Sequence, residues 1–283
     1  MSERHATPPA QMRPALEATQ AQLTSAYQSQ ARAVRSLSAT VRMSPVAGSA
    51  YSGVIEQYHD VGGFILATRP AMIRIIGQAP VVSTDIFDMV SDSETFRIFI
   101  PSKNKFLVGS TKLDRPTKNP IENLRPQHIL DALFWPELRD DTPVLFEQFD
   151  ASPARYYVLT LTRASGAGLE INRKIWFDRS NLRVSRIEIF GPGGRLDSDI
   201  SYSDWQTSTD STASQAPATG AASAEILFPR EIVVTRPQQD YQLSISILKI
   251  ALNGDIPADR FVLEQPAETE LVNLRDEGPG AQP

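Results

Sequence analysis

Short runs in which apolar and polar residues alternate recur along most of the chain and constrain its fold more than any other feature. In TFRIFIP, Phe96 and Ile98 point one way while Arg97 points the other. The runs YYVLTLTR and YQLSISILK repeat this pattern. Because successive side chains of a strand point to opposite faces, such runs bury one face and expose the other. The pattern predicts a mainly antiparallel sheet with one solvated face.

The segment that begins at Pro14 shows the spacing of an amphipathic helix instead. Its apolar residues recur at intervals of three, four and seven positions: Leu16, Leu23, Tyr27, Ala31 and Val34. A second helix is predicted within RPQHILDALFWPEL, where the apolar stripe contains Ile129, Leu130, Leu133 and Phe134. Pro136 restricts its end. We expect this inserted helix to cover the mouth or the concave face of a curved sheet.

The expected domain is bounded by segments of low apolar content. Residues 1–13 are polar and contain prolines, so we expect a flexible leader there. Residues 207–224 are rich in Ser, Thr and Ala and predict a mobile low-complexity loop between two strands. Residues 275–283 are expected to form a disordered tail. These boundaries leave residues 14–274 as a single domain.

Composition excludes several classes of function. The chain has no cysteine, which excludes disulfides, thiolate metal sites and a cysteine nucleophile. Its net charge of −5, without any compensating run of Lys or Arg, argues against nucleic-acid binding. No apolar stretch approaches the ~20 residues needed to span a bilayer. The N-terminus lacks the apolar core of a signal peptide, so we expect a cytosolic protein or a chain whose export signal has been removed.

The most polar stretch, residues 173–205, is dense enough in charge to suggest an active site. It resolves into three strands separated by the turns DRSN and GPGG. Arg186 and Glu188 share the outer face of one strand, as Asp197 and Asp199 do on the next, which predicts a solvated face held by opposed charges. The glycine turn lacks the following helix that a phosphate loop needs. The aspartates lack the glycine and closing glutamate of a calcium loop.

Other catalytic or metal-binding signatures are missing from the sequence. None of the histidines His5, His59 and His128 has a partner at ligand spacing, and there is no HExxH motif, so zinc is not expected. There is also no GxSxG motif to mark a serine hydrolase of that type. We therefore expect neither an enzyme nor a metal or cofactor site.

The remaining signal is the number of large apolar residues predicted to point inward. A curved sheet can fill its interior with its own side chains or leave a cavity for one apolar ligand, and the helices would supply a lid. The candidate residues for such a cavity are Phe64, Leu66, Ile73, Ile75, Phe96, Ile98, Leu133, Phe134, Trp135, Tyr157, Leu159, Ile187 and Ile245.

The order of these elements, together with several phrases, resembles the LolA/LolB-like periplasmic lipoprotein carriers, and is closer to an uncharacterised lipoprotein branch of that superfamily. The phrases are VRSLSATVRM, RPAMIRIIGQAPV, DIFDMVSDSETFRIFIPSKNKFLVG, KIWFDRSNLRVSRIEIF, LFPREIVVTRP and FVLEQPAETELVNL. The resemblance extends from Leu16 to Leu274. It does not identify which arginine corresponds to the one that latches the helices in LolA.

The resemblance implies an α+β fold, an incomplete and strongly curved antiparallel β-barrel of about eleven strands with helices covering its concave face. It also implies a periplasmic or envelope-anchored carrier that holds a lipid or the acyl chains of a lipoprotein. The partners would be that ligand, an envelope protein and the membrane surface, through an outer-membrane lipid anchor if a lipobox was removed. The alternative is a structural module of an envelope assembly with a self-filled cavity. An esterase or lipase ranks last.

Overall fold

The computed structural model describes most of the chain but not all of it. The described residues are 14–49, 54–57, 60–79, 84–111, 126–139, 141–151, 154–166, 168–209 and 225–274. The expected leader, the expected tail and residues 210–224 of the expected loop lie outside this set. The first residues of that loop, Thr207–Thr209, instead continue a strand and pair with 225–227.

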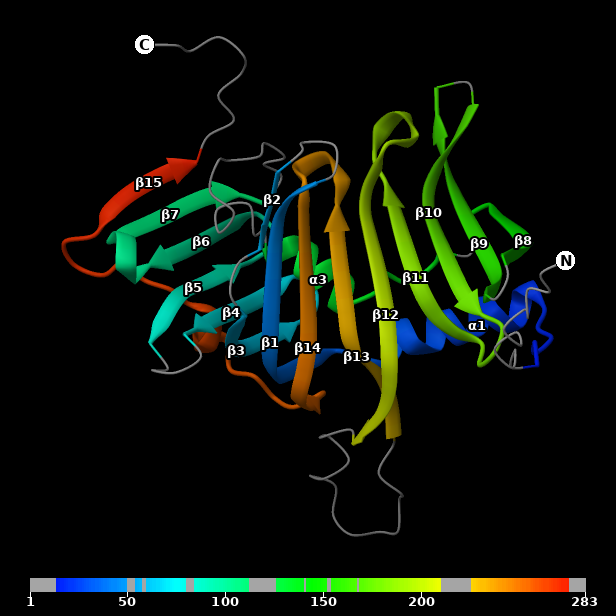
Figure 1. Ribbon diagram of the computed structural model, residues 1–283, viewed down its shortest axis with the longest axis horizontal. Coiled ribbons are helices and arrows are strands. Elements are labelled where there is room, and N and C mark those ends of the chain that lie inside the picture. Colours follow the sequence, from blue (N-terminus) through cyan, green and yellow to red (C-terminus); the bar gives the residue numbers. More distant parts are fainter. Residues whose placement is uncertain are drawn as a thin grey trace, which may run out of the picture.

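All strands of the described residues belong to one fifteen-stranded sheet (Figure 1). In chain order they are β1 (Ser36–Ser49), β2 (Val54–Gln57), β3 (Val61–Thr68), β4 (Met72–Gln78), β5 (Asp85–Ser91), β6 (Thr95–Ile100), β7 (Lys105–Ser110), β8 (Val144–Ala151), β9 (Ala154–Ser165), β10 (Gly168–Asp178), β11 (Arg183–Phe190), β12 (Leu196–Thr209), β13 (Glu225–Arg236), β14 (Tyr241–Leu252) and β15 (Glu270–Leu274).

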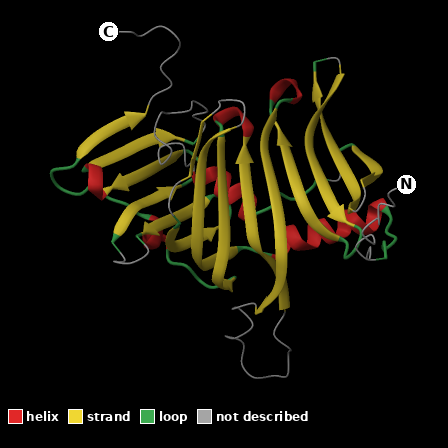
Figure 2. Cartoon of the chain, in the orientation of Figure 1, coloured by secondary structure: helices red, strands yellow, loops and turns green. Residues whose placement is uncertain are grey.

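The sheet is curved and does not close, as predicted (Figure 2). Its order is β15-β7-β6-β5-β4-β3-β1-β14-β13-β12-β11-β10-β9-β8, and β2 pairs with β1 beside this path. Neighbouring strands are antiparallel except for β15 and β7, which are parallel. The expected number of about eleven strands is too low. Along the edge strand β8, residues on both faces are exposed, so burial imposes no alternation that the sequence could reveal.

The first helix, α1 (Gln20–Ala33), begins later than the expected start at Pro14. Thr19 caps it: the Thr19 side chain accepts from the backbone N–H of Gln22, and the Gln22 side chain accepts from the backbone N–H of Thr19. This reciprocal capping satisfies backbone groups that a helix start leaves unpaired, and so sets the first turn. Leu16 therefore lies outside the helix and is 44% exposed.

The second described helix, α3 (Pro126–Leu133), is a short apolar insertion, as expected from its sequence. One further hydrogen bond, from the Phe134 N–H to the Leu130 carbonyl, ends it, and Trp135 and Pro136 follow in an irregular segment. The buried side chains of α1 and α3 join the inward residues of the sheet in one apolar core.

Phe64 and Leu66 correct the predicted inward set. In β3 the buried residues are Gly63, Ile65 and Ala67, so Phe64 and Leu66 point to the opposite face, and Phe64 is 43% exposed. Because residues 64–67 are all apolar, alternation along the sequence does not reveal which parity faces inward.

Candidate functional site

The inner face of the sheet consists of cross-strand rows of apolar side chains. One row runs through β10, β11, β12, β13 and β14 and contains Ile175, Ile187, Ile200, Val234 and Leu243. Each of these side chains is at most 3% exposed. Rows of this kind give the sheet one continuous apolar surface, on which the helices pack.

Eleven of the predicted cavity residues lie in this core, each no more than 6% exposed: Ile73, Ile75, Phe96, Ile98, Leu133, Phe134, Trp135, Tyr157, Leu159, Ile187 and Ile245. They are packed against other side chains of the protein. Whether they also contact a ligand stays a prediction. A cavity of about 160 Å³, lined by Tyr27, Phe177, Leu182 and Trp205 among others, lies beside them. It is smaller than the roughly 300–1,000 Å³ that is typical of ligand sites.

An aromatic cluster connects both helices to the sheet. Trp135, just after α3, stacks on Tyr27 of α1, with ring centroids 5.3 Å apart. The Trp135 indole N–H donates to the Tyr202 hydroxyl at 3.0 Å, and that hydroxyl donates to the Ala132 carbonyl at 3.0 Å. Tyr202 belongs to β12, and burial raises its pKa well above the ordinary value. This cluster ties α1, α3 and the sheet together through side chains that the sequence does not place near one another.

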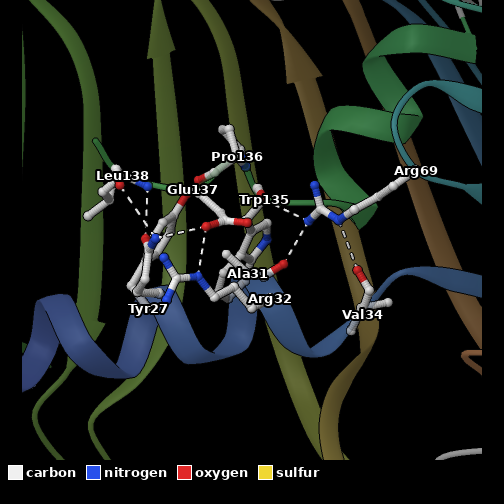
Figure 3. A network of polar contacts seen from close by, with 10 residues as sticks. Tyr27, Ala31, Arg32, Val34, Arg69, Trp135, Pro136, Glu137 and Leu138 are labelled. Atoms are coloured by element: carbon white, nitrogen blue, oxygen red, sulfur yellow. Dashed lines mark hydrogen bonds and ion pairs between the residues drawn. The ribbon is translucent and has the colours of Figure 1, made fainter. Parts of the chain in front are cut away.

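Arg69, the residue after β3, bridges the end of α1 and the segment after α3 (Figure 3). Its Nη2 donates to the carbonyls of Ala31 at 2.7 Å and Trp135 at 2.8 Å, and its Nε donates to the Val34 carbonyl at 3.0 Å. Its guanidinium carbon lies 5.1 Å from the centre of the Phe134 ring. Partial burial lowers the pKa of Arg69, although nearby Glu137 opposes this effect. The sequence did not identify this residue.

Further polar contacts hold residues 136–138 to α1 (Figure 3). The Gln28 side-chain oxygen accepts from the Leu138 N–H at 2.8 Å, and the Tyr27 hydroxyl donates to the Pro136 carbonyl at 3.0 Å. Arg32 and Glu137 form an exposed ion pair at 2.7 Å. The segment after α3 is therefore attached to α1 through side chains rather than through strand pairing.

One inner row differs from the apolar rows because it is polar; we call Arg173, Ser198, Arg236 and Tyr241 the polar row. Arg173 and Ser198 both flank Ile189, on β10 and β12 respectively. Arg236 of β13 donates to the Ser198 hydroxyl at 2.8 Å and pairs across strands with Tyr241 of β14. The row thus places two guanidinium groups and two hydroxyl groups on the inner side of the sheet.

Two side chains of α3, Asp131 and Gln127, lie near the polar row. The surrounding protein raises the pKa of Asp131 although its side chain is exposed, and the charges of both arginines of the row oppose this effect. The Gln127 side-chain nitrogen donates to Asp131 at 3.5 Å. The Arg173 Nη1 lies 3.5 Å from the Tyr27 hydroxyl, so this polar region extends to α1.

In the polar stretch at residues 173–205, the ion pairs of Arg186 lie on the outer face, as expected, whereas Arg179 is buried and pairs with Glu17 and Asp150. Arg186 donates to both carboxylate oxygens of Asp199 at 2.6 Å, and Glu188 lies 3.1 Å from the same guanidinium. Within the described parts of the chain, no group of three or more His, Asp or Glu side chains could hold a metal ion. None of the helices in those parts is long and apolar enough to cross a membrane.

No protein-family model and no curated protein matches the chain. Several solved structures resemble it. A DUF1329 family protein from Desulfovibrio piger has 12% identity and a TM-score of 0.49, covering 84% of this chain and 94% of its own. A LolA superfamily protein from Nitrosomonas europaea has 14% identity and a TM-score of 0.46, with 85% and 97% covered. A putative outer membrane lipoprotein-sorting protein domain from Vibrio parahaemolyticus has 12% identity and a TM-score of 0.44, with 85% and 94% covered.

Proposed function

We propose that this protein is a non-catalytic carrier of an apolar ligand, either a lipid or the acyl chains of a lipoprotein, in the periplasm of a bacterial envelope. The ligand would lie between the inner apolar rows and the two helices, which would cover the concave face. A lipid anchor on the outer membrane and an envelope protein that receives the ligand are parts of the same proposal.

We call α1, α3 and residues 134–138 the cover. The observation that carries the proposal is the way this cover is attached to the sheet. The segment after α3 is held by Arg69 and by side chains of α1, and these contacts can be exchanged for water without breaking any strand pair. Each hydrogen bond to a charged group contributes about 1.5–3 kcal/mol. Burying one methylene group contributes about 0.8 kcal/mol, so an acyl chain of roughly a dozen methylenes offsets the loss of the three Arg69 bonds. The displaced helices would pack on the acyl chain, so their own apolar area would stay buried.

A second candidate is a structural module of an envelope assembly whose interior remains filled. The dense packing of the eleven buried residues favours it, because the described core already satisfies its apolar side chains without a ligand. The two candidates differ in one respect: a carrier needs its cover to move, whereas a structural module does not.

The first test locks the cover. Gln28 of α1 contacts Glu137 at 3.1 Å, so cysteines at these two positions can be bridged by a short bis-maleimide reagent, and the chain has no other thiol. We expect the bridged protein to lose uptake of phospholipid, measured by native mass spectrometry, while the unmodified variant retains it. The control bridges cysteines at Ser25 and Gln28, which both lie on α1 and leave the cover free. Equal uptake by both bridged proteins would contradict a movable cover.

The second test is native mass spectrometry of the unmodified protein before and after extraction with organic solvent. A carrier is expected to show an added mass of lipid size that extraction removes and added phospholipid restores. Replacing Leu133 and Phe134 by Ser should weaken this binding more than it lowers the free energy of unfolding. A folded protein that neither retains nor takes up lipid would favour the structural module.

A further inference from the structure

We infer that the polar row binds the phosphate group of the carried ligand, so that the ligand is a phospholipid rather than an uncharged acylglycerol. This inference rests on the proposed carrier function. It assigns the guanidinium of Arg173 as the phosphate ligand.

Arg173 is the central observation. It points to the same face as Ile175, two positions along β10, and is half-buried. The described residues offer it no ion pair, and its nearest hydrogen-bond partner, the Tyr27 hydroxyl, is at the long distance of 3.5 Å. Within the described parts of the chain, the buried Nε of Arg173 has no hydrogen-bond partner. A guanidinium is always charged and is costly to enclose without a directly bonded anion, and a ligand can supply one in addition to the nearby Asp131 carboxylate.

Tyr241, at the opposite end of the polar row from Arg173, carries another polar group without a partner. Tyr241 is 6% exposed, and its hydroxyl is buried without a hydrogen-bond partner among the described residues. Buried hydroxyl groups without a partner are rare in folded proteins and call for an explanation. Tyr241 pairs with Arg236 across β13 and β14 and lies four strands from Arg173, so it is not a ligand of a phosphate bound at Arg173.

The charge balance at the row favours an anion of modest charge. Among the described residues, the Asp131 carboxylate is influenced by both Arg173 and Arg236, and these three groups are considered together. The arrangement therefore carries a net positive charge of one, which suits a phosphodiester. A guanidinium binds phosphate oxygens in the planar, two-bonded manner that distinguishes Arg from Lys.

The position of the row fits a ligand with a charged head and apolar chains. The neighbouring inner row, from Ile175 to Leu243, is entirely apolar, and two residues along a strand span roughly 6.6 Å. A phosphate at Arg173 therefore lies at the boundary where acyl chains would enter the apolar rows. The inferred site and the proposed carrier cavity would hold two parts of one molecule.

The test compares phosphatidylglycerol with diacylglycerol of the same acyl chains, using fluorescence competition against a bound lipid probe. We expect the protein to prefer phosphatidylglycerol by about tenfold, and Arg173→Met to remove this preference while leaving diacylglycerol binding unchanged. Lys174→Met is the matched control, because Lys174 carries the same charge on the opposite face of β10.

The possible outcomes separate the two proposals. Equal affinity for both lipids, or equal loss in the Arg173 and Lys174 variants, would overturn the phosphate site and leave the carrier function standing. If neither lipid binds, the carrier function fails. Calorimetry with inorganic phosphate then tests whether the polar row binds phosphate at all. Phosphate binding that Arg173→Met abolishes would support the site as one for free phosphate, and failure to bind phosphate would overturn it.

Discussion

Tyr27 and Trp135 stack with their ring centroids 5.3 Å apart and their ring planes inclined by 11°. Tyr27 lies on α1 and Trp135 follows α3, so this contact joins two segments that are distant in the sequence. The Tyr27 hydroxyl also donates to the carbonyl of Pro136, the residue after Trp135. The two helical segments therefore form one unit, and a substitution that loosens one of them is expected to loosen the other.

Arg69→Met should release the segment after α3. Three backbone carbonyls lose their donor, and because Arg69 is partly exposed water replaces part of these bonds, so we expect the free energy of unfolding to fall by about 2–4 kcal/mol. Amide hydrogen exchange at residues 134–138 should accelerate more than exchange in the central strands. Arg42→Met, at an exposed position of β1, is the control. Equal stability and exchange in the two variants would show that Arg69 does not hold the cover.

Gly63→Ala should destabilise the sheet, whereas Gly62→Ala should not. A Cβ at Gly63 would clash with the Ile76 carbonyl oxygen, while a Cβ at Gly62 would meet nothing within 4 Å. The backbone of β3 or β4 must move to admit the first methyl group, and we expect a loss of more than about 2 kcal/mol. The second change should stay within about 0.5 kcal/mol. Urea denaturation of both variants measures the difference, and similar midpoints would contradict the close approach.

Tyr202→Phe should lower stability by about 1–3 kcal/mol, because it leaves the Trp135 indole N–H and the Ala132 carbonyl buried without their shared partner. The near-ultraviolet circular dichroism of the aromatic cluster should also change. Tyr156→Phe is the control, since Tyr156 contacts Trp176 through its ring on the outer face. A Tyr202 variant as stable as the control would mean that water replaces the lost hydroxyl.

Asp92→Asn should change the dependence of stability on pH at the acidic end. Partial burial alone would raise the pKa of Asp92, but backbone N–H groups of Thr95 and Glu94, each 2.7 Å from its Oδ1, and the Thr95 hydroxyl together lower it. Because the folded-state pKa lies below the unfolded-state value, the ionised group stabilises the fold above the unfolded pKa, and this contribution is lost as pH falls through the folded pKa.

The measurement is the free energy of unfolding between about pH 2 and pH 5, a range that brackets the ordinary Asp pKa. The Asn variant should lose less stability on acidification than the parent protein. Asp255→Asn, at an exposed loop position, is the control and should follow the parent curve. Parallel curves for the parent protein and the Asp92 variant would refute the prediction.

Alternation in the sequence was sufficient to predict an antiparallel sheet with one buried face and most of its inner residues, because burial on one face selects side chains at every second position. The prediction was wrong at Phe64, because a continuous apolar run does not reveal which alternate residues face inward. The predicted number of strands was too low, partly because the edge strand β8 is exposed on both faces. The start of α1 was misplaced because Leu16 matched the apolar spacing, whereas the Thr19 capping box sets the first turn.

The polar contacts of the candidate site could not be predicted in the same way. Arg69 contacts backbone carbonyls, and no residue type marks a carbonyl that needs a donor. The polar row did leave a signal, since its members share the parity of inward apolar neighbours: Arg173 with Ile175, Ser198 with Ile200, Arg236 with Val234, and Tyr241 with Leu243. A polar residue at an inward position of an alternating strand therefore merits attention as a candidate site residue.

The pairing of β1 with β14 has a consequence for synthesis on the ribosome. β1 lies between β3 and β14 in the sheet, and Leu37 pairs with Leu252, so the centre of the sheet forms between segments made far apart in time. Until β14 leaves the exit tunnel, one side of β1 offers unpaired backbone groups to other nascent chains. Such non-local pairing slows folding and exposes intermediates to aggregation. We therefore expect the newly made chain to depend on a chaperone that shields β1 until β14 arrives.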